Sequence, residues 1–397
     1  MRGPVLQSGG VLAAARRGYR VVRHSSLLPQ TWVISSGSAT GDYAATQIAA
    51  ALSLPHHTKP ALVPRLPVPL ARAFAGLGSL VGARPTEELQ FVGEALNSEL
   101  PRYVVAASKK ALPGLLEVKR LTKDRTTAVY IGLPDVRLAK IDVLVLSRIE
   151  QMLLRQLGPA RANLDNAVAT LLPFTGIAAG TAQTTRAPTV VVCIGSGFES
   201  AGFQLMSTDV DSLVEGLAHI PSSRIRIVLS SELNPRIRPM VESRLVRRMT
   251  QQAAHTDPAT SVEIIDYALS GQPPFVDVIA SATQVIATAD YLGAVSVAAA
   301  LRRPVYIAGE ERTRGLLRDH YHLLETKNLV RRFYPKGSRF SYMLAPEIRG
   351  PVDAFSAIRD HEPWAPYDAK ADLDSVVAFI RARYKDKTGA GQPQSRV

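Results

Sequence analysis

Short apolar runs alternate with longer stretches of helical periodicity along most of the chain, most clearly at residues 283–308. Val285 to Thr288 is apolar and rich in β-branched residues, which predicts a buried strand. The alanine-rich run Ala294 to Leu301 predicts a helix that ends before Pro304, and Val305 to Ile307 predicts the next strand. A strand, a helix and a strand in this order predict a right-handed βαβ unit with parallel strands.

The same alternation recurs on both sides of a low-charge stretch at residues 158–187. In the first half, strands are expected at Trp32–Ser35, Tyr103–Ala106, Thr127–Ile131 and Asp142–Leu146, and helices at Tyr43–Leu52, Ala71–Val81 and Leu112–Thr122. In the second half, strands are expected at Thr189–Ile194, Ile225–Leu229 and Ser261–Ile265, and helices at Asp209–His219, Arg236–Gln252 and Phe275–Ala282. The proline-rich stretch Pro55–Pro69 is expected to be extended and exposed. The predicted fold is α/β, with two Rossmann-like domains facing a cleft.

Five segments follow from this pattern. Residues 1–30 form a candidate targeting segment, residues 31–187 the first Rossmann-like domain, and residues 188–345 the second. Residues 346–384 are expected to return to the first domain, because the last predicted helix has an apolar face made of Leu373, Val376, Val377 and Ile380. The polar residues 385–397 are expected to be a disordered tail.

Charge changes the picture mainly at the N-terminus. The chain has a formal net charge of +13 over 397 residues, and residues 1–30 contain five arginines and no Asp or Glu. This composition is typical of a mitochondrial transit peptide, although a disordered basic tail is the alternative. No zinc finger pattern or RNA-binding motif accompanies the basic charge, so no nucleic-acid partner is expected. No apolar run is long enough for a transmembrane helix.

Candidate ligand-binding residues follow the predicted strands, because ligands of open α/β sheets lie beyond the carboxyl ends of strands. In the second half they are Gly195, Ser196, Gly197, Ser230, Ser231, Thr288, Asp290 and Ser296. Glycines let backbone amides approach an anion, and a helix N-terminus near Gly293 favours one, so an anionic ligand is expected there. Capping of that helix is the structural alternative for Asp290. In the first half the candidates are Gly37, Gly41 and Lys109, with a plain tight turn or a solvated basic turn as the alternative.

Residue types with reactive side chains add little. The single cysteine, Cys193, excludes an intrachain disulfide and a cysteine-based zinc site, and its apolar run predicts that it is buried. The histidines His56, His57, His320 and His322 have no partner spacing that indicates catalysis, so we expect surface histidines. No catalytic residue and no metal site are assigned.

The block at residues 288–306 resembles the Elongated Mitochondria family of mitochondrial fission proteins. Thr288, Ala289, Asp290, Ser296, Ala298, Pro304, Val305 and Tyr306 stand in register with the family pattern. The resemblance implies a fold similar to the B-type nucleotide-sugar glycosyltransferases. It also implies a dynamin-related protein as a partner, since plant members are implicated in recruiting such proteins to the outer mitochondrial membrane. The location is therefore expected to be mitochondrial, in the matrix or on the outer surface.

Departures from the family pattern remove polar groups from the expected cleft. The family has Glu where this chain has Val297, and in B-type transferases a Glu at that helix start commonly binds the ribose. Asp135 replaces a family arginine, and Tyr43-Ala44 replace Asn-Gln. These departures favour an interaction or adaptor protein without catalytic turnover, in which Val297→Glu would strengthen nucleotide binding. The alternatives are a glycosyltransferase-like enzyme that uses a nucleotide sugar and a domain pair that binds a nucleotide without turning it over.

Overall fold

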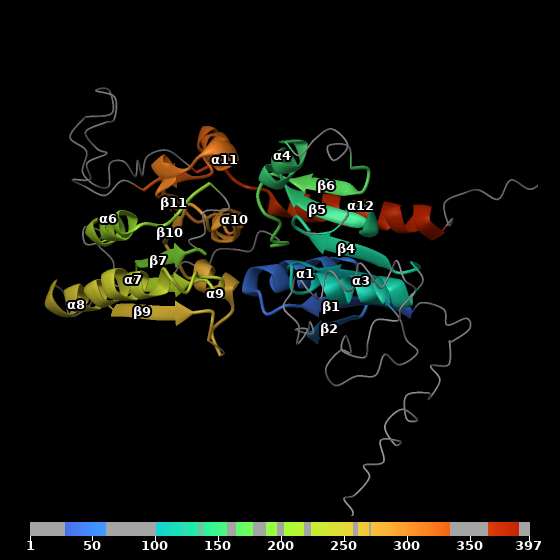
Figure 1. Cartoon of the computed structure of the whole chain (residues 1–397), viewed down its shortest axis with the longest axis horizontal. Helices are drawn as coiled ribbons and strands as arrows, with labels where there is room; N and C mark the ends of the chain where they lie inside the picture. The colour runs from blue at the N-terminus through green and yellow to red at the C-terminus, as the bar shows by residue number, and fades with distance from the viewer. Residues whose placement is uncertain are drawn as a thin grey trace, which may run out of the picture.

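Two parallel sheets of the computed structural model form two separate layers, each covered by helices (Figure 1). The structure describes residues 28–60, 101–122, 124–134, 136, 138–156, 164–177, 188–196, 202–217, 224–256, 261–269, 271–333 and 364–388. Residues 1–27 of the candidate targeting segment and the predicted helix at Ala71–Val81 lie outside this part of the chain, whereas residues 28–30 of that segment belong to the first strand. The fold is α/β with two Rossmann-like domains, as the sequence predicts.

The first domain contains a sheet with the strand order β2-β1-β3-β4-β5-β6, and every neighbouring pair is parallel. Its strands are β1 (Leu28–Ser35), β2 (His56–Pro60), β3 (Pro101–Ala106), β4 (Thr127–Ile131), β5 (Val143–Ser147) and β6 (Ala167–Thr170). The order changes direction between β1 and β3. This is the switch point at which such sheets bind ligands.

The second domain contains a sheet with the order β12-β11-β10-β7-β8-β9, which is also parallel throughout. Its strands are β7 (Thr189–Ile194), β8 (Arg224–Leu229), β9 (Ser261–Asp266), β10 (Gln284–Thr288), β11 (Val305–Ala308) and β12 (Arg331–Arg332). Counted from β7, this is the strand order of a dinucleotide-binding Rossmann sheet, and its switch point lies between β7 and β10.

Helices connect the strands and cover both faces of each sheet. Those of the first domain are α1 (Ala39–Ala51), α3 (Leu112–Leu121), the short 3-10 helix η3 (Leu138–Lys140), α4 (Arg148–Gln156) and α12 (Ala369–Thr388). Those of the second domain are α6 (Ser207–Leu217), α7 (Arg238–Val241), the π-turn η5 (Glu242–Val246), α8 (Arg247–Thr256), α9 (Phe275–Ala280), α10 (Leu292–Ala300), the 3-10 helix η6 (Glu310–Arg312) and α11 (Gly315–Thr326).

Burial on both faces explains why the central strands are continuous apolar runs. All six residues of β7 and all five residues of β4 are buried. Cys193 on β7 is fully buried, as predicted, and burial raises the pKa of its thiol. These strands therefore form the centre of each core.

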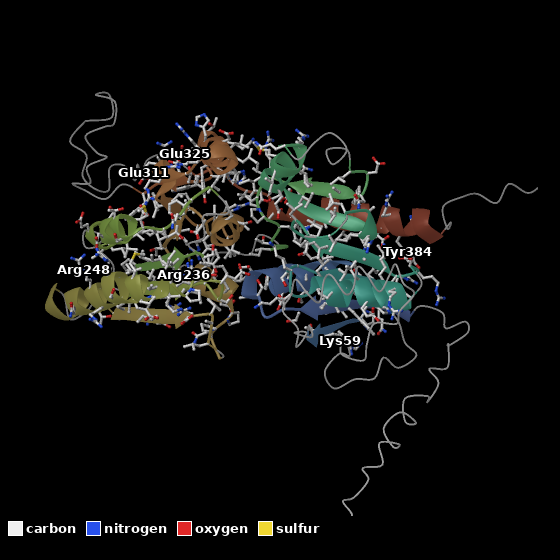
Figure 2. All side chains as sticks on the ribbon, viewed as in Figure 1. Lys59, Arg236, Arg248, Glu311, Glu325 and Tyr384 are labelled. Carbon is white, nitrogen blue, oxygen red and sulfur yellow. The ribbon has the colours of Figure 1, made fainter. Side chains whose placement is uncertain are left out.

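The last helix completes the core of the first domain. Leu373, Val376, Val377 and Ile380 of α12 pack with α1 and one face of the first sheet, while α3 and α4 cover the other face. At the far end of α12, the Tyr384 ring lies 5.2 Å from the ring of Tyr103 on β3, on the outer side of the domain (Figure 2). The chain therefore leaves the first domain after β6 and returns to it at α12.

Several elements differ from the sequence-based expectation. The proline-rich stretch contains the edge strand β2, and the helices α4 and α11 and the strand β6 were not predicted. The helix expected at Arg236–Gln252 is interrupted by the π-turn η5. The disordered tail was expected from residue 385, but α12 continues to Thr388, and residues 389–397 lie outside the described residues.

Candidate functional site

The switch point of the second domain brings Gly195 and Thr288 together. Gly195 follows β7 and Thr288 ends β10, and these strands are neighbours at the centre of the sheet. The Gly195 N–H donates a hydrogen bond to Thr288 Oγ1 at 2.9 Å. Thr288 is buried, so this hydroxyl holds the loop to the neighbouring strand. The backbone amide that was expected to approach an anion is therefore already bound within the domain.

Asp290 fills the space beside Gly195. A Cβ atom added at Gly195 would lie 2.6 Å from the carboxyl atoms of Asp290, so any larger residue there would have to displace this carboxylate. Ser196 Oγ donates to Asp290 Oδ2 at 3.3 Å. The N-cap of α10 is Tyr291, whose side chain makes no capping bond, and capping by Asp290 stays a prediction. The Asp290 carboxylate therefore lies against the glycine loop after β7, at the switch point of the sheet.

Ser230, which follows β8, connects the end of this strand to the loops after β7 and β10. Its N–H donates to the Ile194 carbonyl at 3.0 Å, and its hydroxyl accepts the Glu232 N–H at 3.1 Å. The Tyr291 hydroxyl also bonds to Ser230, and burial raises the pKa of Tyr291. Ser230 is buried, whereas Ser231 is exposed. The structure therefore brings Ser230 together with the loop after β10 and leaves Ser231 outside.

Two positions in α10 face the protein interior. Ser296 is fully buried, and its hydroxyl donates to the Pro173 carbonyl on the segment that leaves the first domain. Val297 is 1% exposed within the core of the second domain. The expectation that a Glu at position 297 would face a ligand is wrong in this structure, because the second turn of α10 points into the core. Val297→Glu would bury a carboxylate rather than create a ribose contact.

The first domain repeats the arrangement with Asp42, which the sequence analysis did not single out. Asp42 Oδ2 accepts hydrogen bonds from the Ser35 hydroxyl at 2.6 Å and the Gly37 N–H at 2.9 Å, while Oδ1 accepts the Ser36 N–H at 3.0 Å. Gly37 has φ +80°, a conformation that glycine adopts without strain. A Cβ atom added at Gly41 would lie 3.2 Å from Ala107, which follows β3. A carboxylate one turn into the helix that follows a glycine loop was the signal available in the sequence.

The loops after β4 and β5 depend on Glu150, which was also missed. Glu150 Oε1 accepts the Leu133 N–H at 3.0 Å, and Oε2 accepts the N–H and the hydroxyl of Ser147, both at 2.7 Å. Burial raises the pKa of Glu150, whereas these hydrogen bonds lower it. The predicted Lys109 is exposed in the loop after β3.

The strand ends of the two domains meet where α1 and α10 begin. The position of a Gly293 Cβ lies 3.7 Å from Thr40 Oγ1, and Ala39 and Tyr43 of α1 pack against the core of the second domain. Burial raises the pKa of Tyr43, and the nearby Asp277 carboxylate adds to the effect. The beginning of α1 therefore lies directly against the beginning of α10.

Taken together, the strand ends carry Asp42, Glu150 and Asp290, each hydrogen-bonded to its own domain. Across the described ranges, no group of three or more His, Cys, Asp and Glu side chains is placed to hold a metal ion. The predicted Gly197 lies outside the described residues. In the same part of the chain, no helix has the length and hydropathy that crossing a membrane requires.

Known structures share this architecture at low sequence identity. The Staphylococcus aureus MnaA–UDP co-structure matches 93% of this chain and 100% of its own at 10% identity, with a TM-score of 0.50. A putative UDP-N-acetylglucosamine 2-epimerase from Listeria monocytogenes matches 90% and 97% at 9% identity, with a TM-score of 0.48. Anabaena HepE in complex with UDP-glucose matches 91% and 99% at 14% identity, with a TM-score of 0.44. These likenesses concern the fold alone. No curated protein sequence matches the chain.

The family model described as mitochondrial fission ELM1 matches residues 5–349, nearly the whole chain. This agrees with the resemblance of the block at residues 288–306, which contains the Thr288 and Asp290 that meet Gly195. The chain belongs to the mitochondrial fission ELM1 family.

Proposed function

We propose that this member of the mitochondrial fission family is an interaction protein that neither binds a nucleotide sugar tightly nor turns one over. One observation carries the proposal. In each domain, the carboxylate of an aspartate of the chain, Asp42 or Asp290, lies against the glycine loop at the switch point. In nucleotide-binding sheets of this order, the phosphates occupy that place.

Magnitudes favour the carboxylate over a phosphate. A phosphate charge about 4 Å from a carboxylate is repelled by about 4 kcal/mol at the effective dielectric constant of a protein surface. The N-terminus of a helix such as α10 contributes typically 0.3–1 kcal/mol, and about 2 kcal/mol at most, toward binding the same charge. The repulsion therefore outweighs the attraction. The net difference of about 2–3 kcal/mol corresponds to roughly a 30- to 150-fold loss of affinity.

The glycosyltransferase-like enzyme is the competing function. General acid–base catalysis needs a group that can exchange a proton with a substrate in the transition state. Asp42, Glu150 and Asp290 lie close to described strand ends, and each accepts hydrogen bonds that hold its own loop in place. A role in positioning loops explains all three without a reaction.

Calorimetry with the full chain tests the proposal. UDP, UDP-glucose and UDP-N-acetylglucosamine should each bind more weakly than about 1 mM, and the nucleotide sugars should release UDP no faster than a protein-free control. Asp290→Asn removes the charge and keeps the shape, so it should tighten UDP binding. Asp374→Asn is the matched control, because Asp374 is exposed on α12 away from the switch points. Micromolar binding or turnover by the unmodified chain would overturn the proposal.

The partner and the location follow from the family resemblance. We propose a dynamin-related protein as the partner, with residues 1–30 directing the chain to mitochondria. Co-sedimentation of the two purified proteins should depend on both being present, and absence of co-sedimentation would contradict the adaptor role. A fusion of residues 1–40 to a fluorescent protein should reach mitochondria, and a cytosolic fusion would contradict the targeting role. Protease protection of isolated mitochondria would then distinguish the matrix from the outer surface.

A further inference from the structure

A second contact between the domains joins α4 of the first domain to α11 of the second. The two helices lie side by side (Figure 1). Ile149 of α4 packs against the core of the second domain. The buried face of α11 consists of Leu317, His320, Tyr321 and Leu324, at helical spacing. This contact is separate from the one between α1 and α10.

His320 is the exception on this face. It is fully buried, which corrects the expectation of a surface histidine, because the spacing of the helix places it between Leu317 and Leu324. Within the described part of the chain, neither Nδ1 nor Nε2 of His320 makes a hydrogen bond. A neutral imidazole has one donor and one acceptor, and leaving a buried polar group unsatisfied costs about 1–3 kcal/mol. The packed contact between α4 and α11 therefore includes an unfavourable free energy, which is removed when water forms hydrogen bonds with the His320 ring.

The charged groups around His320 do not supply an acceptor for a protonated ring. On α4, the positive charge of the Arg148 guanidinium lowers the pKa of the His320 imidazole. The Glu150 carboxylate on the same helix already accepts hydrogen bonds from Leu133 and Ser147. On α11 itself, the Tyr321 ring lies 6.2 Å away, and its hydroxyl donates to the Ala289 carbonyl. On η6, which contacts α11, Glu310 pairs with Arg332, and Arg312 pairs with Asp209 of α6.

We propose that the contact between α4 and α11 is an acid-sensitive latch between the domains, closed while His320 is neutral and opened when His320 is protonated. A protonated ring would have two donors without acceptors and would face the positive charge of Arg148. In the open form, water satisfies the ring and separates the two charges. The latch goes beyond the proposed function, because it acts whether or not the switch points bind a ligand.

Linkage gives the size of the effect. Burial, followed by the charge of Arg148, lowers the pKa of His320 to about 4 in the closed form. In an open, hydrated form the pKa should return to about 6.5. A depressed pKa in the closed form means that closure is fully favoured above pH 6.5 and is lost as the pH falls toward 4. The equilibrium constant for opening should rise about tenfold between pH 7.5 and pH 5.5.

Distance measurements between labels on α4 and α11 test the latch. Leu153 and Lys327 are exposed, so Leu153→Cys and Lys327→Cys provide labelling sites. The single native cysteine, Cys193, is fully buried and should not react. Pulsed electron–electron double resonance on the spin-labelled full chain should resolve a closed population and an open population with a longer distance between the labels. The ratio of open to closed molecules should grow about tenfold when the pH is lowered from 7.5 to 5.5. An unchanged distance distribution would overturn the proposal.

Variants assign the response to His320. In His320→Leu, the latch should stay closed and the pH response should vanish, because the ring and its unsatisfied groups are gone. In the matched control His322→Leu, the response should persist, since His322 is exposed on the same helix. A response that persists in His320→Leu, or that vanishes in the control, would refute the assignment. If His320→Leu does not fold, Arg148→Gln at an exposed position carries the test, and its response must be smaller than in the unmodified chain.

Discussion

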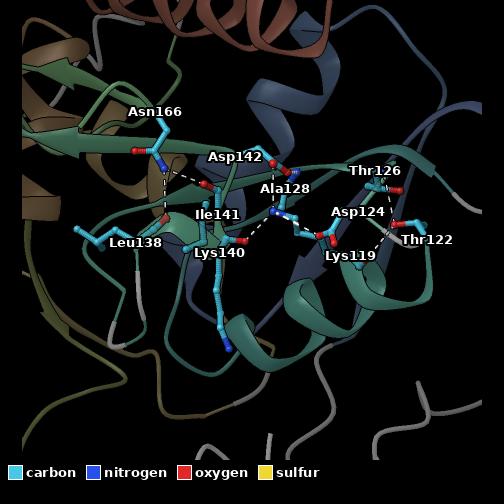
Figure 3. Close-up of polar contacts among 10 residues, drawn as sticks. All are labelled: Lys119, Thr122, Asp124, Thr126, Ala128, Leu138, Lys140, Ile141, Asp142 and Asn166. Atoms are coloured by element: carbon cyan, nitrogen blue, oxygen red, sulfur yellow. Dashed lines mark hydrogen bonds and ion pairs between the residues drawn. The ribbon is translucent and has the colours of Figure 1, made fainter. Parts of the chain in front are cut away.

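Substitution of Asp142 should destabilise the first domain by an amount that the structure lets us calculate. Asp142 precedes β5, and its Oδ1 lies 3.0 Å from Lys119 Nζ at the end of α3 (Figure 3). Its Oδ2 accepts the N–H of Ala128 on β4 at 2.8 Å, while Lys119 also donates to the Lys140 carbonyl at 2.9 Å. One carboxylate thus joins a helix to two strands at the end of the sheet opposite the switch point.

Asp142→Asn keeps an oxygen for Ala128 but leaves Lys119 without its charged partner. The side chains of Lys119 and Asp142 are only 11% and 15% exposed, and breaking a buried pair costs about 3–5 kcal/mol. Asp124, at 3.7 Å and 76% exposed, and the Lys140 carbonyl compensate in part. We therefore expect a loss of about 2–3 kcal/mol. For a domain of this size that loss lowers the melting temperature by about 4–12 °C.

Calorimetric unfolding and a double-mutant cycle measure this cost. Asp142→Asn and Lys119→Met should each destabilise the first domain, and the double variant should lose less than the sum, because neither leaves the other charge buried. Arg120→Gln is the control: Arg120 pairs with Glu117, but its side chain is 51% exposed, so the change should be within about 1 kcal/mol. Additive effects in the cycle, or a loss no larger than in the control, would refute the reasoning.

Two further predictions concern buried carboxylates of the second domain. Burial, followed by the Glu325 carboxylate of α11, raises the pKa of Glu310 to about 7, against about 4.3 in an unfolded chain. Figure 2 labels Glu325 and Glu311, the neighbour of Glu310 in the chain. The bound proton therefore stabilises the fold below about pH 4.3, and this contribution is lost as the pH rises to 7. The melting temperature should fall more steeply between pH 5 and pH 8 in the unmodified chain than in Glu310→Gln. An equal dependence of the melting temperature on pH in the two proteins would contradict the raised pKa of Glu310. Val297→Glu should destabilise the second domain by several kcal/mol, since it buries a charge without a partner; a gain in UDP affinity without loss of stability would contradict the core position of Val297.

The strands that form continuous apolar runs in the sequence were the most predictable elements of the fold. The bounds of β4 and β7 agree with the sequence analysis, because strands buried on both faces need apolar residues at every position. The strand β2 has the sequence His-His-Thr-Lys-Pro and no such pattern. It is defined by pairing with β1 at the edge of the sheet, which is tertiary information. The π-turn inside the helix after β8 likewise leaves no signature in the hydrophobic period.

The location of the candidate site was predictable from the sequence, but its hydrogen bonds and side-chain contacts were not. Thr288, Gly195 and Ser230 meet at the switch point because the ends of parallel strands must meet there. Whether Asp290 caps a helix or fills a loop depends on side-chain geometry across the sheet, which spacing alone does not determine. His320 illustrates the same limit, since α11 was not predicted and His320 was expected at the surface, whereas the described structure buries its ring without a hydrogen-bond partner.

The return of α12 to the first domain has a consequence for synthesis on the ribosome. The first sheet leaves the exit tunnel early, but the face that carries Val33 and Val129 is covered by residues 373–380, which are made more than 200 residues after β6 begins at Ala167. The second domain can bury its own core before that point. The nascent first domain must therefore wait with an apolar face uncovered, the condition in which aggregation competes with folding and chaperones bind. Stop codons before α12 should accordingly harm the domain that was translated first.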